Sequence, residues 1–196
     1  MLLKLIKRLM IVFILLIAFV PATKSQEVAV QFGSDMIAVE RQAQLGLGED
    51  IRRRLVTLPF YDVFDWLEGE LKPDGTLVLR GQVTRPTLKS DAEHNVRDLP
   101  GVSRVINEIE VLPAFPADDR LRLRIYRAIY NLNSPLARYA VRAVPPIHII
   151  VNNGRVTLKG TVATAMESRL AETYARQVSG SFEVRNELRV EQERPL

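Results

Sequence analysis

The sequence contains no cysteine and only two histidines, His94 and His148. Without cysteine there is no disulfide, no thiol chemistry and no lipid-modified cysteine behind a leader. Two separated histidines do not make a metal cluster, and we predict that both are surface residues, His148 because it lies on the polar side of a strand opposite Lys159. A P-loop, a dinucleotide fingerprint and a nucleophile elbow are also absent. These absences favour a protein that is not an enzyme and needs no cofactor or metal.

No charge of one sign dominates once the first residues are set aside. The chain has 27 Lys and Arg, 23 Asp and Glu, and a formal net charge of +4. Four of the basic residues precede residue 26, so the remainder carries 23 residues of each sign. A neutral chain offers no general argument for nucleic-acid binding. The balance is uneven, with 10 basic against 15 acidic residues over 26–116 and 13 against 8 over 117–196. This asymmetry predicts different partners, or docking between an acidic first domain and a basic second one.

Residues 1–25 have the layout of a secretory signal peptide. Three basic residues precede an uninterrupted apolar run from Leu9 to Val20, and small or polar residues follow. Cleavage after Ala22 or after Ser25 fits this pattern. The run is short for a bilayer-spanning helix, which needs about 20 apolar residues. We predict a periplasmic protein released by cleavage; an uncleaved inner-membrane anchor over residues 9–20 is the alternative.

A stretch with two glycines occurs twice in the chain. GTLVLRGQV over 75–83 reappears as GRVTLKGTV over 154–162, and the match continues at a constant offset of 79 residues to Val111 and Val190. About a third of the aligned positions are identical, and a repeat of this kind is read before any other feature. It predicts two small domains, the first over 49–113 and the second over 117–192. Residues 26–48 are predicted to be a linker with some helix.

The residues around each repeated glycine predict a hairpin. In the first copy, 73–75 (Pro-Asp-Gly) fits a three-residue loop, which pairs Leu71 with Leu77 and sets Glu68 opposite Arg80, a favourable cross-strand pair.

In the second copy, Asn153-Gly154 is a type I′ turn that pairs Val151 with Val156. The glycines inside the second strands, Gly81 and Gly160, fall on the apolar face. We predict that their missing side chains let a helix approach the sheet closely.

Apolar residues at helical spacing predict two helices in each copy. The first copy has one before Pro59, one over 87–99, and a last strand over 102–112. In the second copy the two predicted apolar stripes are Leu121, Ile125, Ile129 and Leu132, and Met166, Leu170, Tyr174 and Val178. Its last strand covers 182–190, and an insertion containing Ser134-Pro135 as a helix cap and first turn runs to Pro146. Each copy is therefore helix–strand–strand–helix–strand, an α+β fold.

This order of elements resembles the BON domain family, present here twice. The pattern is glycine–hydrophobic–x–Leu–x–Gly–x–Val, a helix, and then Gly–x–x–x–Val–x–Asn–x–Leu/Ile–x–Val. The residues that carry it are Gly75, Leu79, Gly81, Val83, Gly101, Val105, Asn107 and Val111, and Gly154, Leu158, Gly160, Val162, Gly180, Val184, Asn186 and Val190. The resemblance covers nearly the whole chain behind the leader.

The resemblance implies two tandem αββαβ domains, each a three-stranded mixed sheet with two helices. It also implies export to the periplasm, a non-catalytic role in envelope integrity and osmotic stress, and association with phospholipid. It brings no catalytic residues. The glycines of the motif, together with Asn107 and Asn186, are interpreted as structural, with each asparagine hydrogen-bonding within its strand or loop.

Function is therefore sought where the two copies differ. Arg120, Arg124 and Arg127 are spaced to line one side of a helix, and Arg138 and Arg142 repeat the i, i+4 spacing on the insertion. Such a basic surface is either ordinary solvated helix, a binding surface for anionic phospholipid headgroups, or a docking surface for the acidic first domain. We select phospholipid binding through these five arginines; a protein-interaction or scaffolding module of the periplasm is the alternative.

Overall fold

The computed structural model describes residues 44–178 and 180–191. The predicted signal peptide and most of the predicted linker lie outside these residues. Residues 44–56 are helical, so the last residues of the predicted linker, Gly46 and Gly48 among them, lie inside a helix. Residues from Leu47 onward belong to one compact unit that contains both repeats.

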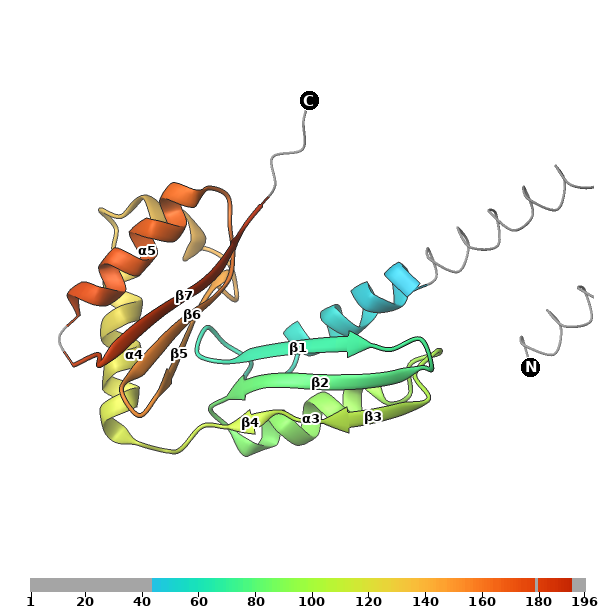
Figure 1. Ribbon diagram of the computed structural model, residues 1–196. Coiled ribbons are helices and arrows are strands. Elements are labelled where there is room, and N and C mark those ends of the chain that lie inside the picture. The colour runs from blue at the N-terminus through green and yellow to red at the C-terminus, as the bar shows by residue number, and fades with distance from the viewer. Residues whose placement is uncertain (1–43, 179, 192–196) are drawn as a thin grey trace, which may run out of the picture. The chain divides into compact units, whose positions relative to one another are not determined.

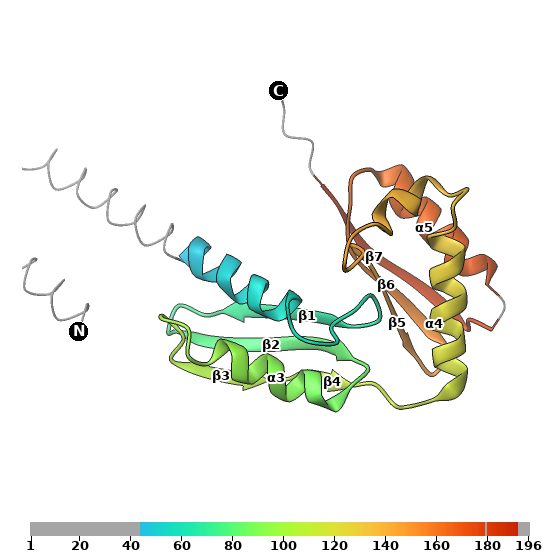
Figure 2. The ribbon, with the colours of Figure 1, turned by 180° about the vertical axis from the view of Figure 1, so that it is seen from behind.

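The first repeat is built on one mixed sheet. Strands β1 (Trp66–Leu71) and β2 (Thr76–Val83) form an antiparallel hairpin, and β3 (Arg104–Asn107) and β4 (Glu110–Val111) both pair in parallel with β2 (Figure 1). The helix over 44–56 and helix α3 (Pro86–Val96) cover one face of this sheet (Figure 2). Their apolar sides meet the sheet in a core that includes Ile51, Leu55, Leu77, Leu79, Leu88, Ala92 and Val96.

The second repeat has the same order of elements. Strands β5 (Ile147–Asn152) and β6 (Arg155–Val162) are antiparallel, and β7 (Glu183–Val190) pairs in parallel with β6. Helices α4 (Pro116–Ile129) and α5 (Ala165–Gln177) lie on one face, and the insertion forms the 3₁₀ helix η2 (Pro135–Tyr139) beside α5. This arrangement confirms the predicted α+β class and the tandem αββαβ repeat.

Both predicted hairpin registers are confirmed. Leu71 pairs with Leu77 and Val151 with Val156, because the length of each turn fixes which residues face each other. Asn153 and Gly154 have φ of 51° and 75°, as a type I′ turn requires.

The ion pairs of the first sheet differ in one respect from the prediction. Glu68 does lie opposite Arg80 in the register. The guanidinium of Arg80, however, pairs with Glu70 at 2.5 Å and with Glu108 at 2.9 Å. Glu68 instead lies 3.7 Å from Arg189 of the second repeat. The long arginine side chain reaches the carboxylates diagonal to it and on the next strand, which register alone does not reveal.

Gly81 and Gly160, which recur at equivalent positions of the two repeats, are required for a different reason from the predicted close approach of a helix. Their φ values are +132° and +119°, a backbone conformation that favours glycine. A Cβ at residue 81 would overlap the backbone carbonyl of Trp66 in β1, and a Cβ at residue 160 would overlap that of Pro146, the residue directly before β5. The glycines therefore permit a local distortion of the hairpin, and the close neighbour is a strand rather than a helix.

Two predicted core residues are exposed. Leu132 is 96% exposed because α4 ends at Ile129, before the next turn would bring residue 132 onto the core side. Met166 is 66% exposed, since the buried side of α5 is formed by Glu167, Ala171 and Ala175. The helix begins one residue before Met166, and a capping box between Thr164 and Glu167 turns the Glu167 side chain inward.

Candidate functional site

The row of arginines predicted on one side of a helix lies on the outer side of α4. Arg120, Arg124 and Arg127 are all exposed, and none of them forms an ion pair within the part of the chain that the structure describes. Leu123 lies between them on the same side and is 46% exposed. We call these four residues the α4 surface. It combines cationic groups with an exposed apolar side chain, a pattern that suits a polar–apolar interface.

A fourth arginine of the same helix points inward, which the sequence pattern did not reveal. Arg122 is buried; it donates to the carbonyl of Val151 at 2.6 Å and pairs with Asp119. The carboxylate of Asp118, also buried, accepts the backbone N–H of Asn153 at 2.7 Å and of Gly154 at 2.9 Å. These contacts hold α4 against the hairpin turn, so the outward side of the helix has a fixed orientation.

The two predicted arginines of the insertion have other surroundings. Arg138 pairs with Glu167, and its guanidinium lies 5.0 Å from the ring centre of Tyr139. The hydroxyl of Tyr139 donates to Glu167 at 3.0 Å and accepts the N–H of Ala163 at 3.0 Å. Arg142 lies 5.8 Å from the centre of the same ring. Arg138 therefore has a structural role in attaching η2 to α5, whereas Arg142 is exposed and makes no ion pair among the described residues.

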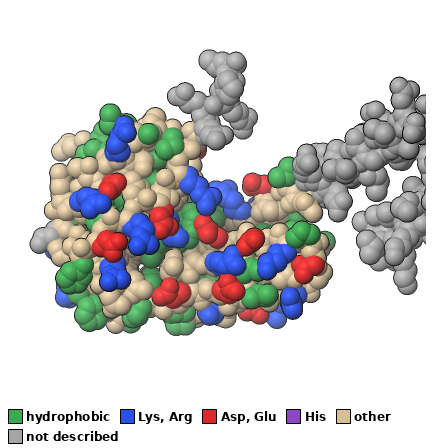
Figure 3. All heavy atoms as spheres, in the orientation of Figure 1, with side chains coloured by type: hydrophobic (Ala, Val, Ile, Leu, Met, Phe, Trp, Pro, Cys, Tyr) green, Lys and Arg blue, Asp and Glu red, His purple; other side chains and the backbone are tan. Residues whose placement is uncertain are grey.

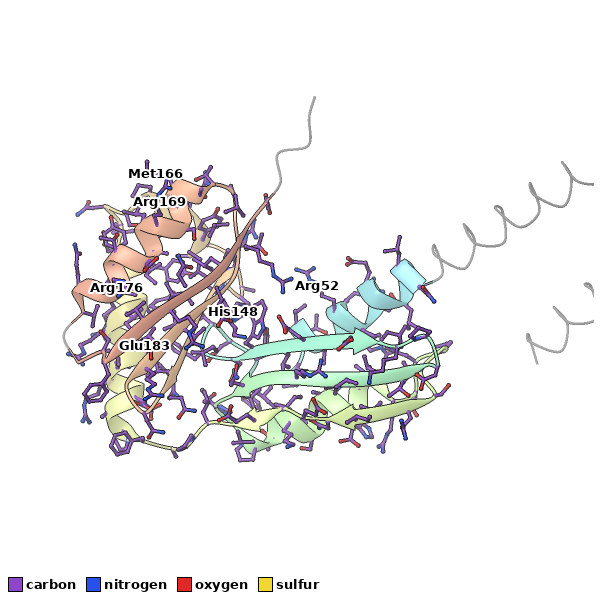
Figure 4. The ribbon with its side chains drawn as sticks, viewed as in Figure 1. Arg52, His148, Met166, Arg169, Arg176 and Glu183 are labelled. Atoms are coloured by element: carbon purple, nitrogen blue, oxygen red, sulfur yellow. The ribbon has the colours of Figure 1, made fainter. Side chains whose placement is uncertain are left out.

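His148 is a correction to the predicted surface histidines. It is only 6% exposed, and burial lowers the pKa of its imidazole to about 4. Its ring lies 5.0 Å from the ring centre of Trp66 and 5.6 Å from that of Tyr61. Figure 4 shows it between β5 and the loop that leads into β1. The polar side of β5 is covered there by residues of the first repeat. His94, as predicted, is exposed.

Several contacts join residues of the two repeats within this unit. The N–H of Ile149 donates to the carbonyl of Val63 at 2.8 Å, and Val63 packs in the core of the second repeat. The Asn152 amide donates to Glu110 at 3.2 Å. Two hollows have residues of both repeats in their walls. The first, of about 830 Å³, is lined mainly by charged and amide side chains, and the second, of about 670 Å³, by charged side chains together with apolar ones such as Ile51, Leu55 and Trp66. In the described residues no three His, Asp or Glu side chains gather as a metal site would require.

The two motif asparagines occupy equivalent positions. Asn107 donates to the carbonyl of Lys89 at 2.8 Å, and its side-chain oxygen accepts the N–H of Ile109. Asn186 donates to the carbonyl of Ser168 at 3.1 Å and accepts the N–H of Leu188. Each asparagine thus ties the last strand to the preceding helix. The motif glycines Gly75, Gly101, Gly154 and Gly180 all have positive φ.

Comparison with solved structures finds the C-terminal domain of CdsD, the structural protein of the type III secretion system of Chlamydia trachomatis. It is 15% identical, over 72% of this chain and 96% of that chain, with a TM-score of 0.25. A second structure of CdsD is also 15% identical and covers 71% of this chain and 90% of that one, with a TM-score of 0.25. No curated protein sequence matches the chain.

Comparison with models of protein families identifies the domain type. The BON domain matches residues 73–113 and 131–192, which together exceed half of the chain and fall in both repeats. No helix within 44–178 or 180–191 is long and apolar enough to cross a membrane. The chain therefore belongs to the BON domain family, a non-catalytic and envelope-associated family, and carries the domain as a tandem pair.

Proposed function

We propose that this protein is an exported, non-catalytic component of the cell envelope that binds anionic phospholipid through its second BON domain. Binding of this kind supports envelope integrity or tolerance of osmotic stress. The observation that carries the proposal is the α4 surface, where Arg120, Arg124 and Arg127 are exposed and form no ion pair among the described residues. The proposed route is export by the leader over residues 1–25 into the periplasm, as its charge and hydropathy pattern indicates.

Charge supports the second repeat as the membrane-facing one. An anionic lipid surface attracts basic residues by about 1 kcal/mol for each residue near it. The three arginines of the α4 surface form no ion pair among the described residues, so their full charge is available to the lipid. Most other arginines of the second repeat form an ion pair with a carboxylate, as Arg176 does with Glu172 at 2.7 Å. Arg138 contributes little because it is already paired with Glu167. Arg142 adds one further exposed cation.

The two repeats stay docked during this attachment. The backbone bond from Ile149 to Val63 and the salt bridge between Arg189 and Glu68 support this part of the proposal. A docked acidic repeat lies away from the membrane because like charges repel it, so the protein is oriented on the surface.

Vesicle flotation of the full mature chain tests the proposal. The protein should float with vesicles that contain phosphatidylglycerol, remain behind with pure phosphatidylcholine, and be largely released by 0.5 M salt, since salt screens exposed charges. Replacing Arg120, Arg124 and Arg127 by serine should lower partitioning on the order of 100-fold, from about 3 kcal/mol of lost attraction.

A matched control removes the same charge elsewhere. Arg53, Arg54 and Arg97 are exposed residues of the first repeat, and their triple replacement by serine should leave flotation nearly unchanged. Equal losses in both triple variants would show that net charge, rather than the α4 surface, binds the lipid. Failure of the wild-type chain to float on any lipid, with recovery of a defined protein complex, would favour the alternative scaffolding function.

A further inference from the structure

The two sheets have four outer edges, and within the described residues three of these edges are covered or short. A backbone N–H of β5 donates to the carbonyl of Val63 at 2.8 Å. On β7, the Asn186 side chain accepts the N–H of Leu188 and Arg176 donates to the carbonyl of Val184. The edge formed by β3 and β4 is divided into segments of four and two residues. Covering or shortening an edge in this way prevents it from pairing with another chain.

Strand β1 has an open edge. The N–H of Lys72 donates to the carbonyl of Thr76 at 2.8 Å, and alternation along an antiparallel ladder therefore directs the N–H and C=O groups of Gly69 and Leu71 away from β2. No other strand or side chain within 44–178 and 180–191 binds these outward groups. Gly69 is exposed in the middle of the strand, and a glycine without a side chain lets another backbone approach closely.

The helix over 44–56 forms a wall beside this edge. A Cβ at Gly69 would lie 2.9 Å from Cγ2 of Ile51, so the helix lies directly against the strand. Ile51, Leu55 and Val56 of the helix and residues 67–70 of β1 line the hollow of about 670 Å³. An open sheet edge inside a groove is where peptide-recognition domains bind an extended peptide as an added strand.

Arginines of both repeats line the same hollow. Arg52, which Figure 4 labels on the helix, and Arg142 are exposed, and neither forms an ion pair within the described part of the chain. Arg189 lies 3.7 Å from Glu68, and both side chains are largely exposed, so this pair is weak. Figure 3 shows basic side chains gathered over the junction of the two repeats. A carboxylate binds guanidinium groups through charge-assisted hydrogen bonds, so the groove favours an acidic partner.

We infer that this groove binds an extended peptide segment of another protein, as a strand added to β1 with an acidic residue beside Arg52 and Arg142. The peptide runs antiparallel to β1, because antiparallel pairing is the more stable arrangement. Its C-terminal part then lies beside the start of β1, where Arg189 approaches Glu68. Alternate side chains of the peptide face the helix, where Val56 is 37% exposed and accommodates an apolar residue. This surface is separate from the α4 surface, and binding to it does not require lipid.

A designed peptide tests the inference directly. The probe is a short peptide of alternating valine and threonine that ends in a pair of glutamates, titrated into the full mature chain without vesicles. Trp66 is the only tryptophan of the chain and lines the groove, so its fluorescence should change as the peptide binds. The amide hydrogens of Gly69 and Leu71 should exchange more slowly in the complex, because they become hydrogen-bonded in the new strand pair.

N-methylation of the peptide distinguishes strand addition from other modes of binding. In an added strand, alternate peptide N–H groups face β1 and the others face solvent. Methyl groups on the first set should abolish binding, whereas methyl groups on the second set should leave it nearly unchanged. Equal effects of the two sets would contradict strand addition.

A pair of neighbouring arginines tests the acidic preference. Arg52→Ser should weaken peptide binding about tenfold, since it removes a hydrogen bond to a charged group. Arg53→Ser is the matched control, because Arg53 pairs with Asp50 and does not line the groove. Lysines in place of the peptide glutamates should weaken binding to the wild type, with no further loss in Arg52→Ser.

Two outcomes would overturn the inference. One is a wild-type chain with neither a fluorescence change nor slower exchange at Gly69 and Leu71 in millimolar peptide. The other is identical peptide affinity of Arg52→Ser and Arg53→Ser. Neither outcome bears on vesicle flotation, which depends on the α4 surface, so the proposed lipid function would survive both.

Discussion

The imidazole of His148 donates from Nδ1 to the backbone carbonyl of Asp65 across a distance of 2.6 Å. These residues belong to different repeats and are 83 positions apart in the chain. The carbonyl is fixed because the buried Asp65 carboxylate accepts both the N–H of Thr84 at 2.6 Å and its hydroxyl at 2.9 Å. A neutral histidine therefore bridges the second repeat to a rigid loop of the first, and its charge state affects this contact.

Stability should fall with acidification because of His148. Burial lowers the pKa of its imidazole to about 4 in the folded protein, against an ordinary value of 6.5. Above pH 6.5 the neutral form prevails in both states, and as pH falls below this value the unfolded state alone takes up a proton. Between pH 6.5 and pH 5 we expect a loss of roughly 2 kcal/mol in the free energy of unfolding.

Urea denaturation at pH 7 and at pH 5 measures this loss. His148→Gln should reduce the pH dependence, whereas the exposed His94→Gln should retain it. An unchanged pH dependence in the His148 variant would assign the effect to other groups.

Replacing Gly160 by alanine should destabilise the second repeat by at least about 2 kcal/mol. The residue has φ of +119°, and a Cβ would overlap the carbonyl of Pro146, which is backbone and cannot rotate away. Gly48 provides the opposite control, since it lies in a helix with open space around it. Gly48→Ala should raise stability by up to about 1 kcal/mol. Thermal denaturation of the two variants gives the comparison, and equal midpoints would refute this role of Gly160.

Asn186→Ala should cost roughly 2 kcal/mol of stability. The amide donates to the carbonyl and hydroxyl of Ser168 and to Glu172, and its oxygen accepts the N–H of Leu188. Removing it leaves several partly buried groups without a partner. The exposed Asn133 is a suitable control, because replacing it by alanine should change stability by less than about 0.5 kcal/mol. Chemical denaturation measures both, and faster amide exchange in β7 of the Asn186 variant would locate the effect.

Tyr139→Phe should loosen the insertion and cost about 1.5–2 kcal/mol. The lost hydroxyl donates to the side chain of Glu167, which also pairs with Arg138, and it accepts the N–H of Ala163. Hydrogen bonds that belong to an ion-paired group are worth more than isolated neutral ones. Tyr174→Phe is the control, since the described structure gives the Tyr174 hydroxyl no hydrogen-bond partner. Greater protease sensitivity near η2 in the Tyr139 variant alone would support this role. Identical stability of the two variants would contradict it.

Much of the fold was predictable because its determinants are local. A hairpin register depends on the length and conformation of its turn, so 73–75 and Asn153-Gly154 were sufficient to pair the strands. The helix cap at Ser134–Pro135 was predictable for the same reason, because capping depends on neighbouring residues only. The Ser134 hydroxyl accepts the N–H of Leu136 at 3.1 Å. The tandem organisation was also visible in the sequence, since two copies of one pattern at a constant offset require no tertiary information. The family was indicated there only by the resemblance of the motif, which the family comparison confirms.

The arginine surface was less predictable than the fold, because arginines with similar positions in the sequence pattern have different surroundings in the structure. The pattern of α4 placed Arg120, Arg124 and Arg127 on one side, and they are exposed. It did not predict that Arg122 is buried against β5 or that Arg138 is neutralised by Glu167. Those outcomes depend on strands and helices that are distant in the chain.

By itself the sequence determined the repeat, the element order, the registers and the row of arginines on α4, because periodicity and turn chemistry act over a few residues. Only the tertiary structure decided what covers each surface. It buried His148 by placing the loop before β1 over the polar side of β5. It brought Phe182 next to the start of α4 through Gly154 and Asp118. The burial of a side chain and its ionic partners depend on which helices and strands pack against it. The spacing of residues along the sequence does not reveal that packing.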